Sequence, residues 1–171
     1  MKVALPPAWV MVSVGLILNI TAIILSSQVL DKMSGEVAML QERKNSNLYS
    51  IQLAWNQVET LERKRETLQL HLAQSQTITP EISLSLRGQL ARWVNADVPE
   101  IELANLSELM RLINKAQQGQ RNIIDELYLD NLSLTEAIQF VEEEMAYYKN
   151  IALFLQIFGL ALILARDLSV R

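Results

Sequence analysis

Hydrophobic residues are concentrated in two segments near the ends of the chain, and a long section of mixed polarity separates them. The first segment runs from Trp9 to Ser27 without a charged residue, and the second runs from Ile151 to Ala165. A helix needs about 20 mostly apolar residues to cross a hydrocarbon core of about 30 Å. The pattern therefore predicts an N-terminal transmembrane anchor over residues 1–29 and a C-terminal transmembrane helix with a short tail over residues 150–171.

Aromatic and basic residues at the edges of these segments are typical of the membrane–water interface. The expected interface anchors are Trp9, Tyr147, Tyr148 and Arg166. The first segment is longer than the apolar core of about 7 to 15 residues in a signal peptide, and it does not end in an A-x-A-like cleavage site. We expect an uncleaved anchor, with a cleaved signal peptide as the alternative.

The middle section, residues 30–149, begins with apolar residues at alternating steps of three and four, a spacing typical of a coiled-coil-like helix. It predicts a first helix over about 30–75 and leaves open whether this helix is kinked or broken near 43–47, where polar residues interrupt the series. The positions are Leu30, Met33, Val37, Leu40, Lys44, Asn47, Ile51, Ala54, Val58, Leu61, Arg65, Leu68 and Leu72.

Three further helices are predicted over about 80–94, 105–129 and 134–149. Thr79 and Pro80 are typical of a helix start, and Ser133 and Glu136 form a capping box for the last helix. The expected fold is all-α: an antiparallel, coiled-coil-like helical bundle continuous with the two transmembrane helices.

Each apolar segment carries a stripe of small and polar residues on one helix face. Transmembrane helices associate through such residues, because small side chains let backbones approach and amides form hydrogen bonds. We predict an antiparallel contact, within or between chains, in which Asn19 and Gln156 lie level and form a hydrogen bond. The alternatives are that each amide bonds its own backbone or that the amides line a pore. The contact residues are Gly15, Asn19, Ala22, Ser26, Ala152, Gln156 and Gly159.

In the middle section the best candidate for docking a partner is an apolar seam on the first helix. It consists of Ile51, Val58, Leu61 and Leu68. Trp55 and Trp93 are expected in core or interface packing, with no cofactor implied.

Composition narrows the candidate chemistry. Half of the residues are hydrophobic, Cys is absent and the formal net charge is −4, which argues against nucleic acid as the main partner. The single His71 lacks a second His or Cys, and the acidic run Glu142 to Glu144 is typical of a solvated face. We predict no catalytic residue, no metal site and no cofactor.

The membrane topology is predicted from basic residues, which are enriched on the cytoplasmic side of transmembrane helices. Lys2 precedes the first apolar segment, and Arg166 and Arg171 follow the second. They predict an integral protein of a bacterial inner membrane with both termini cytoplasmic and residues 30–149 extracytoplasmic, and a cytoplasmic middle section is the alternative. The expected function is a non-enzymatic scaffold, assembly or regulatory subunit that contacts lipid, a second copy or another membrane protein. The alternatives are an extracytoplasmic sensor module that signals through a partner, and a membrane-disrupting or pore-forming effector with a cytoplasmic middle domain.

Overall fold

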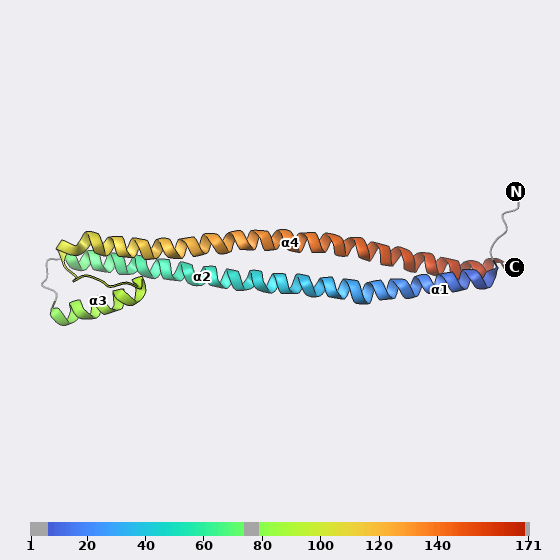
Figure 1. Cartoon of the computed structure of the whole chain (residues 1–171), viewed down its shortest axis with the longest axis horizontal. Coiled ribbons are helices and arrows are strands. Elements are labelled where there is room, and N and C mark those ends of the chain that lie inside the picture. Colours follow the sequence, from blue (N-terminus) through green and yellow to red (C-terminus); the bar gives the residue numbers. More distant parts are fainter. Residues whose placement is uncertain (1–6, 74–78, 170–171) are drawn as a thin grey trace. The chain divides into compact units, whose positions relative to one another are not determined.

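The computed structural model describes residues 7–73 and 79–169, and these residues contain helices and no strand (Figure 1), which confirms the all-α fold class. The elements are α1 (Ala8–Ile24), the π-helix η1 (Leu25–Leu30), α2 (Asp31–Ala73), α3 (Pro80–Val94), the short 3-10 helix η2 (Leu103–Asn105) and α4 (Leu106–Ser169). α2 and α3 agree with the predicted helices over about 30–75 and 80–94.

The predicted boundary between helices 105–129 and 134–149 is wrong, because both belong to the single helix α4. The capping box at Ser133 therefore lies inside a helix and not at its start. Neither Gly nor Pro occurs between Gly119 and Gly159, and Asn131 and Leu134 are both buried on the inward face at this point. The buried residues before and after Ser133 thus stabilise one continuous helix, although the local sequence could have started a new helix.

The chain divides into two compact units, and both α2 and α4 contribute to each of them. Unit 1 consists of Met1–Arg43 and Ser133–Arg171, and unit 2 consists of Lys44–Leu132. The thirteen positions of the predicted series, Leu30 in η1 and the other twelve in α2, occur in both units, and all are buried or half-buried. The spacing of three and four therefore located the inward face of α2 correctly.

Unit 2 has a core in which the second half of α2 packs with α3, the following loop and the start of α4. Its buried residues are Leu61, Leu68, Leu90, Val98, Ile101, Leu109 and Ile113. Asn95 ends α3 in the left-handed conformation (φ 50°), which turns the chain back. The guanidinium of Arg87 then donates a hydrogen bond to the carbonyl of Val98 and lies 3.5 Å from a carboxylate oxygen of Asp97. These contacts hold the loop that carries Val98 and Ile101 into the core.

The first turn of α4 carries an exposed ion pair. Arg111 donates from Nε to Glu108 Oε2 at 2.8 Å, and this hydrogen bond lowers the pKa of Glu108 below its ordinary value. A carboxylate that stays charged near the start of a helix interacts favourably with the positive end of the helix dipole. The pair therefore supports the start of α4 in unit 2.

α2 continues through residues 43–47, so the helix has no break at the point that the sequence left open. Asn47 Nδ2 donates to Asp130 Oδ2 at 2.7 Å and to Asn131 Oδ1 at 3.0 Å, and Asn131 is buried. The polar residue that interrupted the apolar series thus has partners on α4. A buried Asn at such a position can fix the register of two packed helices.

We expect Asn47→Ala to lower the free energy of unfolding of unit 2 by about 1 to 2 kcal/mol, because it leaves the buried Asn131 without this donor. Asn56→Ala is the matched control, since Asn56 is exposed and bonds Gln52 on its own helix; its effect should stay within about 0.5 kcal/mol. Chemical unfolding followed by circular dichroism measures both. Equal losses in the two variants would contradict a stabilising role for Asn47.

In unit 1 the inward positions of α4 keep a strict spacing of seven residues. They are Ile138, Met145, Ala152 and Gly159, all buried or half-buried. Gly15 and Ala22 have the same spacing on α1. If this spacing continued, an inward residue would lie at position 36 of α2, but the inward residue is Val37, one position later. The π-helix η1 lies between them, and its wider turn accommodates an additional residue. It therefore brings the inward faces of α1 and α2 into phase.

Candidate functional site

The tightest contact in unit 1 joins α1 to the last part of α4 at two glycines. A Cβ added to Gly15 would lie 2.6 Å from the carbonyl oxygen of Gly159, and a Cβ added to Gly159 would lie 2.7 Å from that of Gly15. The two backbones are therefore in direct contact. Ala22 and Ala152, each seven residues from the glycine of its helix, are also buried. The structure thus brings these four members of the predicted stripes into an antiparallel contact within one chain.

The two amides of the stripes do not pair across this contact. Asn19 Nδ2 donates to the carbonyl of Gly15 on its own helix at 2.9 Å, which is the local alternative, and Gln156 is exposed. The side-chain amide of Asn19 lies against Gly159 of α4, so its neighbour across the contact is Gly159 and not Gln156. Ser26 is exposed as well.

The outward faces of these helices are formed by large apolar side chains. Those exposed are Trp9, Val14, Leu16, Ile17, Ile20, Ile23 and Ile24 on α1 and Leu153, Phe154, Ile157, Phe158, Leu160 and Leu164 on α4. Two helices are long and apolar enough to cross a membrane, and 11% of the most apolar window of each is buried inside the protein. A core helix of a soluble protein would have most of such a window buried.

The predicted interface anchors lie near the edges of these apolar faces. Trp9 is 71% exposed and Tyr147 is 64% exposed, whereas Tyr148 is half-buried. The rings of Tyr147 and Tyr148 form an edge-to-face pair with centroids 5.7 Å apart. The side chain of Arg166 lies outside the described part of the chain.

The predicted docking seam is not available to a partner. Val58, Leu61 and Leu68 are 7%, 2% and 6% exposed, and Ile51 is half-buried. The same side chains belong to the inward face of α2, and Leu61 and Leu68 lie in the core formed with α3 and α4. The periodicity identified an apolar face correctly, but the chain itself covers that face.

Large apolar side chains are also exposed on unit 2, beside its packed face, and they were not predicted as a site from the sequence. Trp55 is half exposed and borders a depression of about 430 Å³ that also includes Gln52 and Glu59 of α2 and Arg121 of α4. Other exposed side chains of this unit are Leu48, Tyr49, Leu53, Tyr128, Leu129 and Leu132. The sequence contained a signal for these exposed residues. Leu48 and Trp55 each follow an inward position of α2 and are seven residues apart, so they lie on the same side of the helix.

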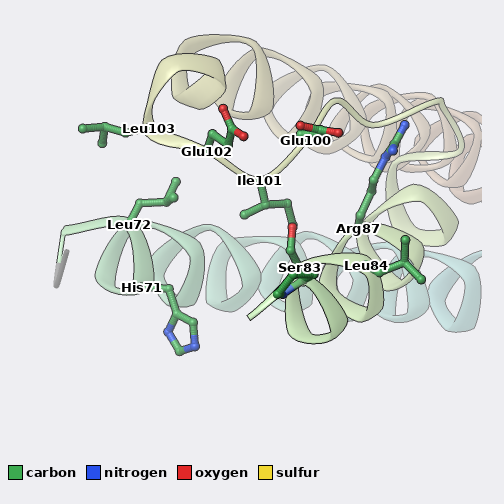
Figure 2. A pocket seen from close by; sticks show the side chains of 10 residues that line it. His71, Leu72, Ser83, Leu84, Arg87, Glu100, Ile101, Glu102 and Leu103 are labelled. Atoms are coloured by element: carbon green, nitrogen blue, oxygen red, sulfur yellow. The ribbon is translucent and has the colours of Figure 1, made fainter. Parts of the chain in front are cut away.

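A pocket of about 570 Å³ lies between the end of α2, the start of α3 and the loop before α4 (Figure 2). His71 is exposed, and in Figure 2 its imidazole points away from Glu100 and Glu102. Within the described residues no three His, Cys, Asp or Glu side chains are grouped so that they could hold a metal ion. Arg87, which also borders the pocket, is engaged with Val98 and Asp97.

The fold and its contacts define an all-helical protein with two long apolar helices that pack against each other through small residues and expose large apolar side chains. Comparison with known proteins finds no matching family model, no matching curated protein and no matching solved structure.

Proposed function

We propose that this chain is a non-enzymatic protein anchored in a membrane by two helices, α1 and the last part of α4. The observation that carries the proposal is the contact between Gly15 and Gly159, which brings the two helices together through small residues while their large apolar side chains face outward. In water such a face would cost about 25 cal/mol for each Å² of apolar surface left uncovered. In a bilayer, lipid covers it, and close backbone contact is a usual way for helices to associate there.

Within this proposal the protein acts as a scaffold, assembly or regulatory subunit, and its mechanism lies in contacts with a second copy or with another membrane protein. The large apolar side chains exposed on unit 2 support this role, because large exposed apolar surface is typical of protein–protein interaction sites. Tyr49, Trp55 and Tyr128 are the large aromatic members, and aromatic side chains are frequent anchors of protein interfaces. This surface replaces the buried seam as the docking candidate. An inner membrane with both termini cytoplasmic remains the proposed location.

Membrane insertion is tested by extracting native membranes at alkaline pH, which releases peripheral proteins and retains integral ones. We expect the full chain to stay in the membrane pellet. Complete release into the supernatant would overturn the proposal of two membrane-spanning helices.

We expect the wild-type chain, solubilised from its native membrane in mild detergent, to form a complex larger than the 19.4 kDa monomer. The double variant Trp55→Ser and Tyr128→Ser should break this complex, because it removes two of the three large aromatic groups from the proposed interface. Trp93→Ser is the control, since Trp93 is also exposed but lies on α3. Mass determination of the intact complexes reports the result. A monomeric wild type, or a double variant that assembles normally, would contradict the proposed role.

A further inference from the structure

Unit 1 contains an open groove between the N-terminal helices and α4, with a volume of about 740 Å³. The π-helix η1 contributes Gln28 and Val29 to its wall, so the groove begins where the helix geometry departs from a regular α-helix. Such π-helical turns are frequent at functional sites. In the proposed membrane orientation, Gln28 and Tyr148 mark the outer edge of the apolar segments.

The charged residues of the groove comprise one cation and two anions. Lys32 and Glu36 come from α2, and Glu144 comes from α4. Within the described residues, none of the three takes part in an ion pair or a hydrogen bond. The groove therefore offers an uncommitted ammonium and two uncommitted carboxylates to a ligand.

The depth of these charges matches the headgroup layer of a bilayer. Lys32 lies four residues beyond Gln28, and Glu144 lies four residues before Tyr148, which places each about 6 Å outside the apolar edge at 1.5 Å per residue. The polar layer on each side of a hydrocarbon core is about 5 to 8 Å thick. Met33 and Val141 also line the groove with apolar surface, as does the exposed ring of Phe140.

We propose that this groove binds the headgroup of a zwitterionic aminophospholipid, with Lys32 contacting the phosphate and Glu144 and Glu36 accepting hydrogen bonds from the primary ammonium. The charges of the groove complement those of the ligand, because the headgroup carries one anion and one cation joined by a short linker. An anionic lipid has no cationic group that could pair with the two carboxylates of the groove. A choline headgroup has no N–H donor for these carboxylates. The assignment rests on the proposed membrane insertion.

The test uses the full chain purified in mild detergent and titrated with dioleoyl phosphatidylethanolamine, dioleoyl phosphatidylcholine or dioleoyl phosphatidylglycerol. Bound lipid is counted by mass spectrometry of the intact complex. We expect phosphatidylethanolamine to bind at least about fivefold more tightly than either of the others, as the loss of a charge-assisted hydrogen bond implies. Equal binding of the three lipids, or preference for either of the other two, would overturn the assignment.

Adjacent glutamates provide a matched pair of variants. Glu144→Gln should abolish the preference for phosphatidylethanolamine, whereas Glu142→Gln, which changes an exposed carboxylate that does not line the groove, should keep it. Lys32→Gln should weaken phosphatidylethanolamine and phosphatidylcholine by similar factors, because both carry the phosphate, and Lys149→Gln should weaken neither. Circular dichroism establishes that each variant keeps its helices, and Glu36→Gln provides a second test of the ammonium contact.

The same experiment separates this assignment from the proposed function. A chain that resists alkaline extraction but binds the three lipids equally would remain a membrane protein without this lipid site. A chain released by alkaline extraction would lose the proposed function and the site together. Equal effects of Glu142→Gln and Glu144→Gln would show a nonspecific charge effect and would also overturn the assignment.

Discussion

Gly159→Val should separate α1 from the last part of α4 and destabilise unit 1 by about 2 to 3 kcal/mol. Even a Cβ at position 159 would lie 2.7 Å from the carbonyl oxygen of Gly15 and closer still to the side-chain amide of Asn19. The first of these neighbours is backbone, which cannot rotate away, so the helices must move apart. Overpacking of this kind typically costs about 1 to 3 kcal/mol, and the larger Val side chain places the expected effect at the upper end.

Because the chain contains no Cys, the contact can be measured directly by engineered disulfide formation. Ala22→Cys combined with Ala152→Cys should cross-link efficiently within one chain, since both positions are buried in register with the two glycines. Gly159→Val in this background should reduce cross-linking strongly. Ile23→Cys combined with Leu153→Cys places both thiols on exposed faces and should cross-link poorly in every background.

Gly35→Ala is the matched control for this substitution. Gly35 lies in α2, also in unit 1, and an added Cβ there meets nothing within 4 Å. Alanine should therefore stabilise the helix by up to about 1 kcal/mol through its higher helix propensity. Undiminished cross-linking in the Gly159→Val background would contradict the tight contact between α1 and α4. A loss of cross-linking in Gly35→Ala as large as that in Gly159→Val would also contradict it.

The sequence predicted the elements and inward faces of this protein well, because helical periodicity depends on local spacing. The thirteen positions from Leu30 to Leu72 share one inward face in the structure. What covers that face was not predictable from spacing. Leu61 and Leu68 have the same apolar character whether a partner or another part of the chain packs on them, and the answer depends on where α3 and α4 return.

Polar positions were predicted less well, because a polar side chain has several satisfactory partners. Asn47 left open whether the first helix breaks near this residue, and hydrogen bonds to Asp130 and Asn131 accommodate it in a continuous helix. Asn19 could have bonded another helix, and it bonds the carbonyl one turn earlier on its own helix. The capping box at Ser133 is a valid start signal that packing on both sides overrides. In each case the tertiary contacts selected one of several locally acceptable outcomes.

Deletion of Ser27 in the π-helix should be tolerated, whereas deletion of Ala146 on α4 should disrupt unit 1. Ser27 lies inside η1, where the N-terminal helices contain one residue more than the spacing of seven requires. Its removal lets the chain continue as a regular α-helix with its inward faces in phase. We expect an unchanged or higher free energy of unfolding.

Ala146 is also exposed, but it lies where the inward positions of α4 keep their spacing of seven from Met145 to Gly159. Its deletion rotates everything that follows by about 100°, one residue of a helix with 3.6 residues per turn, and moves Ala152 and Gly159 off the contact. The expected loss is about 3 kcal/mol or more, comparable to one or two buried side chains. Unfolding in detergent, followed by circular dichroism, measures the stability of both variants. Cross-linking between cysteines at positions 22 and 152, in the numbering of the intact chain, measures the contact between α1 and α4. If the Ser27 deletion proved as damaging as the Ala146 deletion, η1 would not be absorbing an extra residue, and its π-helical turn would need another cause.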